Sequence, residues 1–122
     1  KHIEYWPNGK KKTERNDMDG LRDYKLTDWY ENGQKRQELI YKFKNADPNL
    51  IKGKVKTWYK NGQKKSVYGI YLIQGLEELM DKATFWYANG QKKYEGYMEN
   101  SYRVGKWTFY NKDGSVKEVK EY

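Results

Sequence analysis

The chemistry that this sequence could perform centres on aromatic and cationic residues that recur side by side. The phrase WYENGQKR occupies residues 29–36, and close copies follow as WYKNGQKK at 58–65 and WYANGQKK at 86–93. A weaker copy, YWPNGKKK, occupies 5–12, and FYNKDGSVK occupies 109–117. Aromatic rings attract cations that lie over their faces, and aromatic residues and Arg concentrate binding energy at interfaces. The phrase therefore predicts either stacked pairs that hold a sheet together or a surface that binds a partner.

The residues on which enzymes most often depend are scarce or scattered. The 122-residue chain has no cysteine, which excludes disulfides, thiolate metal ligands and thiol nucleophiles. Its single histidine, His2, has no neighbouring partner for a triad or a metal site. The stretch Asp17–Gly20 resembles a calcium loop only in part, because the terminal Glu is missing at the required spacing. We therefore expect no catalytic residue, no metal and no cofactor.

The composition indicates a small, basic, aromatic-rich domain. Lys and Arg number 25 and Asp and Glu number 17, which gives a net charge of +8. Such a charge favours acidic partners, namely nucleic acid, anionic lipid or an acidic protein, although it also serves solubility alone. Aromatic residues make up 17% of the chain, so we expect half-buried Tyr and Trp to replace much of an aliphatic core. No apolar stretch is long enough to cross a membrane.

The repeated Asn-Gly pairs predict β-hairpins. They stand at 8–9, 32–33, 61–62 and 89–90, each between two strand-like runs. Asn-Gly suits a two-residue type I′ turn, because both residues tolerate positive φ. The fifth copy, Asn111–Gly114, reads as a turn one residue longer that is closed by a glycine bulge. The sequence therefore predicts five tight antiparallel hairpins.

This register places an aromatic residue directly opposite a cation in every hairpin. Stacking in such a pair contributes about 0.5–1 kcal/mol when the pair is exposed. The opposite face carries residues such as Tyr24, Leu26 and Leu39, is more apolar, and is expected to be better buried. The predicted pairs are Tyr5–Lys12, Trp29–Arg36, Trp58–Lys65, Trp86–Lys93 and Phe109–Lys117.

Polar stretches between the hairpins are expected to form loops. They cover 15–22, 43–52, 74–82 and 99–106, and Leu76–Met80 within them is expected to form one helical turn. The predicted fold is all-β: a single twisted antiparallel meander of tandem hairpins with about ten short strands. Residues 1–122 form one repeat domain, with repeats at approximately 1–19, 20–47, 48–75, 76–100 and 101–122.

The phrase W-Y-x-N-G-Q-K-K, with Gly105-Lys106-Trp107 before the last copy, resembles the bacterial variant of the MORN repeat. In that family a unit of about two dozen residues forms a β-hairpin. The resemblance implies a non-catalytic interaction module that binds another protein. It implies a place at the bacterial cell envelope or outside the cell, with a lipid anchor in the full-length form. It also implies an alternative, a cytoplasmic antitoxin or immunity protein.

The aromatic and cationic residues of the repeats are the candidate partner-binding site. The alternative is that they only hold the sheet together. Binding of anionic lipid or of single-stranded nucleic acid through the same basic surface is a further alternative. Charges on the last strand should discourage edge pairing, so we expect a monomer, with a weak dimer as the alternative. The candidate residues are Trp29, Trp58, Trp86, Phe109, Arg36, Lys65, Lys93 and Lys117.

Overall fold

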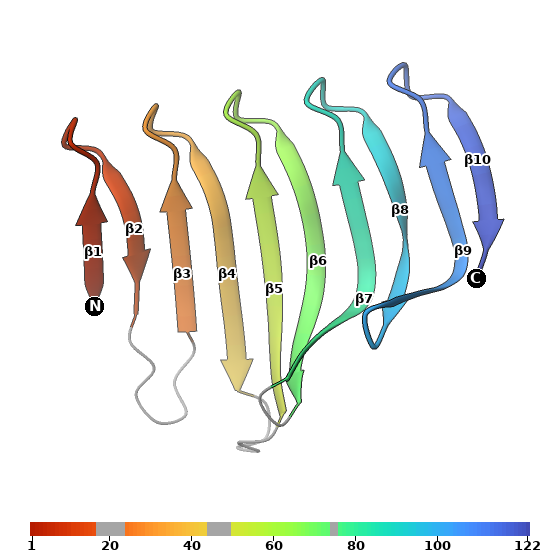
Figure 1. The fold of residues 1–122 in the computed structure, drawn as a ribbon, viewed down its shortest axis with the longest axis horizontal. Helices are drawn as coiled ribbons and strands as arrows, with labels where there is room; N and C mark the ends of the chain where they lie inside the picture. Colours follow the sequence, from red (N-terminus) through yellow and green to blue (C-terminus); the bar gives the residue numbers. More distant parts are fainter. Residues whose placement is uncertain (17–23, 44–49, 74–75) are drawn as a thin grey trace.

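The computed structural model describes residues 1–16, 24–43, 50–73 and 76–122 and contains one open β-sheet (Figure 1). Ten antiparallel strands follow one another in chain order, and no helix occurs among the described residues, which confirms the predicted all-β meander. The strands pair as five hairpins, here called hairpins 1 to 5. They are β1 His2–Tyr5, β2 Lys11–Arg15, β3 Tyr24–Trp29, β4 Lys35–Phe43, β5 Leu50–Trp58, β6 Lys64–Ile73, β7 Leu76–Trp86, β8 Lys92–Glu99, β9 Tyr102–Tyr110 and β10 Val116–Glu121.

All five turns share one geometry, and it differs from the predicted type I′ turn. In hairpin 2 the amide of Tyr30 donates to the carbonyl of Gln34 (2.8 Å), and the amide of Gly33 donates to the carbonyl of Tyr30 (3.0 Å). Gly33 has φ 91°, whereas Asn32 is not at positive φ. The turn is therefore a three-residue loop closed by a glycine bulge. Asn111–Gly114 forms the same loop, so the glycine-bulge turn predicted for the fifth copy is confirmed, and the two-residue turns predicted for the first four copies are wrong.

A bulge beside each turn changes every predicted aromatic–cation pair. Trp29 lies opposite Lys35 rather than Arg36, because the ladder slips between Asp28 and Trp29. The predicted cations Lys12, Arg36, Lys65, Lys93 and Lys117 are each the extra residue of a bulge and have no cross-strand partner. The observed partners are Tyr5–Lys11, Trp29–Lys35, Trp58–Lys64, Trp86–Lys92 and Phe109–Glu118.

The strands are longer than the sequence suggested, so the predicted loops shrink. Leu76–Met80, expected as a helical turn, begins the eleven-residue strand β7, which pairs with β6 from Ile73 to Ser66. Residues 50–52 belong to β5, and Tyr102–Lys106 belong to β9. Pairing of Leu76–Met80 with β6 outweighs the weak local preference for a turn. The predicted calcium-like stretch at 17–20 and the rest of 17–23, 44–49 and 74–75 lie outside the described residues.

The two faces of the sheet differ in burial. Residues opposite one another share a face, and the row Leu26, Leu39, Val55, Tyr68 defines face A. The buried hydrophobic side chains among the described residues all lie on face A, which confirms the more apolar face as the better buried one. Face B carries Trp29, Trp58 and Trp86, which are half-buried. The buried hydrophobic residues are Val55, Ile70, Ala83 and Trp107.

Candidate functional site

The structure separates the predicted aromatic–cation ladder into two rows. Trp29 and its equivalents project on face B, and the cations nearest to them come from the preceding hairpin. Lys11 lies 5.8 Å from the Trp29 ring, Lys35 lies 5.7 Å from Trp58, and Lys64 lies 5.9 Å from Trp86. These contacts therefore join neighbouring hairpins, whereas the prediction placed them within each hairpin.

The predicted cations Lys65 and Lys93 lie over a different set of rings. Lys65 is 5.6 Å from the Tyr59 ring, and Lys93 is 5.7 Å from the Tyr87 ring. Tyr59 and Tyr87 are the residues that follow Trp58 and Trp86 in the phrase. Phe109 belongs to neither row, because Tyr110 holds the place that Trp29 holds in hairpin 2. The ladder slips at the same relative position, opposite Tyr110 and Trp29, in the two hairpins.

The recurring Tyr and Asn of the phrase connect each hairpin to the next one along the chain. The hydroxyl of Tyr30 donates to the carbonyl of Trp58 (2.7 Å), and the Asn32 amide nitrogen donates to the carbonyl of Lys60 (2.9 Å). Hairpins 3 and 4 repeat both bonds, and hairpin 1 makes them with Trp6 and Asn8. We call these bonds the turn ladder. Each of these hydrogen bonds contributes about 1 kcal/mol to stability. Two of them connect the hairpins at each of the four junctions.

The turn asparagine has two roles at once. Its Oδ1 accepts a hydrogen bond from the backbone amide two residues later, as from Gln63 to Asn61 at 2.9 Å. Its Nδ2 donates onward, as from Asn61 to the carbonyl of Ala88 at 2.8 Å. This explains the Asn of Asn-Gly without positive φ at that residue. The following Gln packs over the next turn, because Gln63 Oε1 lies 3.3 Å from where a Cβ on Gly90 would stand.

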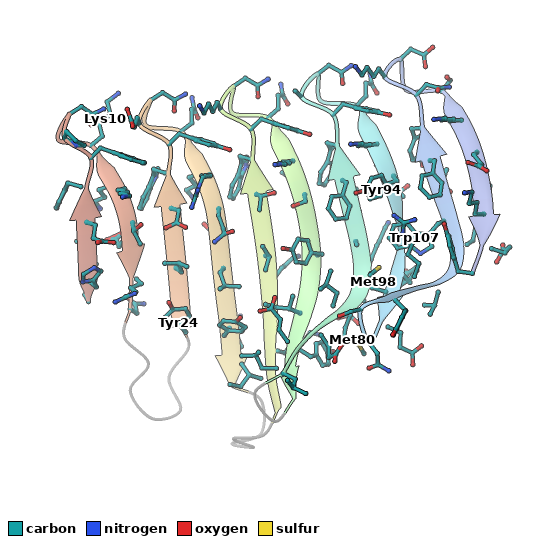
Figure 2. The ribbon with its side chains drawn as sticks, viewed as in Figure 1. Lys10, Tyr24, Met80, Tyr94, Met98 and Trp107 are labelled. Carbon is teal, nitrogen blue, oxygen red and sulfur yellow. The ribbon has the colours of Figure 1, made fainter. Side chains whose placement is uncertain are left out.

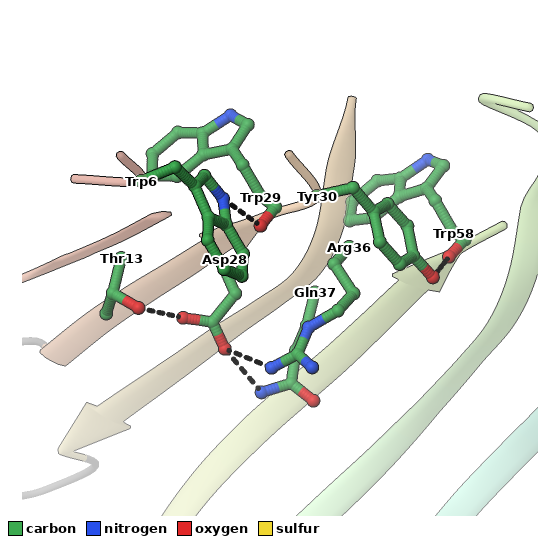
Figure 3. A network of polar contacts seen from close by, with 8 residues as sticks. All are labelled: Trp6, Thr13, Asp28, Trp29, Tyr30, Arg36, Gln37 and Trp58. Carbon is green, nitrogen blue, oxygen red and sulfur yellow. Dashed lines mark hydrogen bonds and ion pairs between the residues drawn. The ribbon is translucent and has the colours of Figure 1, made fainter. Parts of the chain in front are cut away.

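The first two hairpins meet around a buried carboxylate on face A (Figure 3). Asp28 accepts hydrogen bonds from the Thr13 hydroxyl (2.9 Å) and from the Gln37 amide (3.5 Å). Arg36, one of the predicted site residues, forms an ion pair with Asp28 at 3.3 Å. A shallow groove of about 480 Å³ runs beside this network, between Trp6 and Tyr30. Arg36 is therefore paired with Asp28, a carboxylate that holds the sheet together.

A second carboxylate is held on face B between hairpins 4 and 5. The hydroxyl of Tyr110 donates to Glu95 Oε1 (2.8 Å), and Lys92 contacts the same carboxylate at 3.1–3.2 Å. Burial opposes ionisation of Glu95, but the hydrogen bonds from Tyr110 and Lys92 outweigh it and hold its pKa below the ordinary value of 4.5. The same bond raises the pKa of Tyr110. This network fixes hairpin 5 to hairpin 4.

The C-terminal end of face A carries an arginine surrounded by aromatic rings, here called the Arg103 cluster. The guanidinium carbon of Arg103 lies 4.9 Å from the Trp107 ring, and its Nη1 donates to the Tyr122 hydroxyl (3.2 Å). Three further rings lie within 5.5–5.7 Å: Tyr94, Phe109 and Tyr122. Figure 2 shows Tyr94 and Trp107 side by side, and their ring centres are 6.1 Å apart. Of the predicted site residues, Phe109 alone belongs to this cluster.

Two features make the Arg103 cluster suitable for a ligand. Arg103 is exposed, and no carboxylate of the described residues lies within ion-pair distance of it. Trp107, in contrast, is 1% exposed, and its indole nitrogen donates to the carbonyl of Tyr97 (3.0 Å). A rigid aromatic base therefore presents to solvent a guanidinium that has no carboxylate partner in the described chain. In the sequence, the Gly-Lys-Trp motif at 105–107 pointed to Trp107 of this cluster, but no pattern pointed to Arg103.

Lysines gather on face B of the central strands. Lys25, Lys42 and Lys54 are exposed, and none has a carboxylate within ion-pair distance among the described residues. Lys52 beside them forms a long ion pair of 3.7 Å with Asp81. The group accounts for part of the net positive charge and lies on the face opposite the Arg103 cluster.

Within the described ranges, no group of three or more His, Cys, Asp or Glu side chains could hold a metal ion. His2 lies in β1 with its Nε2 3.6 Å from a Glu4 carboxylate oxygen, and no nucleophile is near it in the described contacts. Glu77 and Glu78, two carboxylates adjacent in the sequence, lie in strand β7. The described part of the chain has no helix that is long and apolar enough to span a membrane.

These features define an open, single-layer repeat sheet built from tandem β-hairpins. The family model described as the MORN repeat variant matches residues 25–43, 82–100 and 103–122. The chain belongs to the MORN repeat variant family, with three of its hairpins matched as repeats. No curated protein and no solved structure matched the chain.

Proposed function

We propose that this chain is a non-catalytic scaffold that binds another protein, and that the Arg103 cluster is its main contact. The observation that carries the proposal is an exposed guanidinium packed on aromatic rings with no carboxylate partner in the described chain. Arg, Trp and Tyr are the residues that most often dominate binding energy at interfaces. The partner surface should present a carboxylate, because Arg binds carboxylates through paired, charge-assisted hydrogen bonds.

The residues predicted from the repeats remain a second candidate surface of the same scaffold. Their rings and cations are partly engaged in holding neighbouring hairpins together, which favours a structural role for them. The bacterial envelope or an exported location, or an antitoxin role in the cytoplasm, is supported by the family resemblance. The predicted monomer also stays part of this proposal.

A peptide-display selection tests the proposal even though the partner is unidentified. The full chain is used to select from a random peptide library, and the Arg103→Gln variant serves for counter-selection. We expect peptides that contain Asp or Glu, whose affinity falls about tenfold or more in Arg103→Gln, or about 1.4 kcal/mol. The matched control Arg36→Gln should bind them as wild type does, because Arg36 is paired with Asp28.

Three results would count against the proposal. The first is a selection that yields no peptide, and the second is equal binding by wild type and Arg103→Gln. The third is peptide binding lost in Arg36→Gln, Lys65→Gln or Lys93→Gln, which would favour the repeat surface. Binding of single-stranded nucleic acid or anionic vesicles that disappears with added salt would favour the electrostatic alternatives, with the lysines of face B as the contact.

A further inference from the structure

The cations of face B follow a regular pattern across the central strands β3 to β7, which lie side by side (Figure 1). Directly opposed residues on four of these strands form the row Lys25, Ile40, Lys54 and Gly69. On β7, Lys82 lines the same hollow as Lys54 and reaches Glu95 only at 3.8 Å. Cations therefore occupy every second strand, and the residues between them are uncharged.

Two shallow hollows of about 300 Å³ and 350 Å³ lie along this row. Both are lined by Lys52 and Lys54 of β5, so they form one continuous depression, here called the lysine groove. Ile40 lines one hollow, and Val67 and Thr84 line the other; all three are half-buried. The lysine groove therefore has an uncharged floor and exposed cations along it.

The cations of the lysine groove are poorly compensated. Lys42 and Lys52 lie directly opposite one another on β4 and β5, and like charges in this arrangement oppose strand pairing. In the part of the chain that the structure describes, Lys42 and Lys54 form no ion pair, and Lys52 reaches Asp81 only at 3.7 Å. An anion bound in the groove would therefore relieve a repulsion that the sheet now contains.

The spacing of the cations matches an extended polypeptide. Neighbouring strands lie about 4.8 Å apart, so cations on every second strand are about 9.6 Å apart. A polyproline II segment has three residues per turn and rises about 3.1 Å per residue, so every third side chain points the same way at intervals of about 9.3 Å. Acidic segments also favour extended conformations, because their charges repel one another. A segment with a carboxylate at every third residue therefore matches the lysines of β3, β5 and β7.

Single-stranded nucleic acid and membranes fit the lysine groove less well. Bases bind to such a face by stacking on aromatic rings. Tyr71 lies opposite Lys52 in the neighbouring row, but the Lys52 ammonium already lies 5.6 Å from the centre of that ring. A membrane surface is flat on the scale of the groove, so it would not contact the half-buried Ile40 and Val67 on the floor. The geometry and the charge together favour an acidic polypeptide.

We infer that the lysine groove binds an extended acidic segment of another protein, with a carboxylate at every third residue and proline or aliphatic residues between. The carboxylates pair with Lys25, Lys54 and Lys82, and the residues between them pack on the uncharged floor. Complementary charge of this kind provides specificity and speeds association. This site goes beyond the proposed function, because the groove lies on face B of the central strands and the Arg103 cluster lies on face A near the C-terminal end.

Peptide binding tests the inference. A fluorescent peptide of four Glu-Pro-Pro units is titrated with the full chain at low salt, and anisotropy is measured. The control peptide has the same composition and charge, but its four glutamates are consecutive. We expect the regular peptide to bind about threefold tighter than the control peptide, and Lys54→Gln to weaken its binding about twofold to fivefold. Lys112→Gln, in the turn of hairpin 5, is the matched control and should bind as wild type does.

A second variant separates binding from stability. Lys42→Gln removes one of two opposed cations, so urea unfolding should show no loss of stability, whereas the affinity for the regular peptide should fall about twofold to fivefold. A variant that loses stability but keeps its affinity would contradict a binding role for Lys42 and overturn the inference.

Other outcomes would also overturn the inference. They are absence of peptide binding, equal binding of the two peptides, and unchanged affinity in Lys54→Gln. Binding lost in Arg103→Gln would place the peptide at the Arg103 cluster and not in the groove. Tighter binding of an oligothymidylate of equal length, or of phosphatidylglycerol vesicles, than of the regular peptide would assign the groove to nucleic acid or to a membrane. Failure of any of these tests leaves the Arg103 cluster proposal unaffected, except for the loss in Arg103→Gln, which would support it.

Discussion

The turn side of the sheet and the Arg103 cluster are built from the same residue types but use them differently. On the turn side, the polar atoms of Tyr30, Tyr59 and Tyr87 are bonded to the next hairpin. In the Arg103 cluster the rings pack on one another and leave the guanidinium without a carboxylate in the described chain. Close repetition therefore marks the scaffold, whereas departure from the repeat marks the candidate binding site.

The largest expected effect separates the two regions by burial. Trp107→Ala removes a ring that is 1% exposed, so we expect the free energy of unfolding to fall by about 3–5 kcal/mol. Trp86→Ala removes a half-buried ring on face B, and its cost should be about 1–3 kcal/mol. Urea unfolding followed by circular dichroism measures both. Equal losses would mean that the Arg103 cluster is not packed more tightly than the repeat rows.

A substitution at Gly96 tests the support beneath the cluster. A Cβ at this position would overlap atoms of the buried Trp107 ring, so the ring must move. We expect Gly96→Ala to cost about 1–3 kcal/mol in urea unfolding. Combining it with Trp107→Phe, which makes room, should cost less than the sum of the two single changes. If the two losses of stability simply add, residues 96 and 107 do not contact each other.

A smaller effect is expected from one hydroxyl of the turn ladder. Tyr59→Phe leaves the carbonyl of Trp86 without its side-chain donor and should lower the free energy of unfolding by about 1 kcal/mol. Tyr97→Phe is the control, because Tyr97 is 59% exposed and its hydroxyl makes no hydrogen bond with the described residues. The control should change stability by less than about 0.5 kcal/mol. Similar losses of stability in the two variants would show that this bond of the turn ladder does not stabilise the fold.

The smallest effect is a pH dependence at the junction of hairpins 4 and 5. The pKa of Glu95 is held below 4.5 in the folded chain, so its ionised form stabilises the fold above that pH. This stabilisation should disappear as pH falls through the folded pKa. Glu95→Gln should therefore flatten the acid side of the stability–pH curve, and Tyr110→Phe should flatten it less. An unchanged acid limb in Glu95→Gln would contradict the network.

The sequence predicted the architecture well, because each repeat carries the same local signals. Asn-Gly between alternating runs located four hairpins, and the glycines do adopt positive φ. The turn type was wrong, because the asparagine is selected for its side-chain bonds and not for its own backbone angle. A bulge beside each turn then moved every aromatic–cation pair, whereas the residues farther from the turn, such as Leu26 and Leu39, keep the predicted faces.

The candidate site was harder to predict, since it depends on side chains of β8, β9 and the end of the chain meeting on one face of the sheet. Arg103, Trp107 and Tyr122 come together only when β10 pairs with β9 and brings the end of the chain beside Gly105. No residue spacing in the sequence indicates that these three side chains meet. Phe109 was named as a site residue through an alignment of the fifth turn that is wrong by one position. It does lie in the cluster, but on the face opposite Trp29.

The central claim is that the repeated phrase is a one-way ladder between hairpins, and an isosteric pair of substitutions tests it most directly. Asn61→Asp keeps the bond to Gln63 but replaces the onward donor to Ala88 with an acceptor. Asp113→Asn makes the opposite change in hairpin 5, the last hairpin of the described sheet. We expect urea unfolding to show a loss of about 1–3 kcal/mol for Asn61→Asp and less than about 0.5 kcal/mol for Asp113→Asn. Equal losses, or none in Asn61→Asp, would contradict the account.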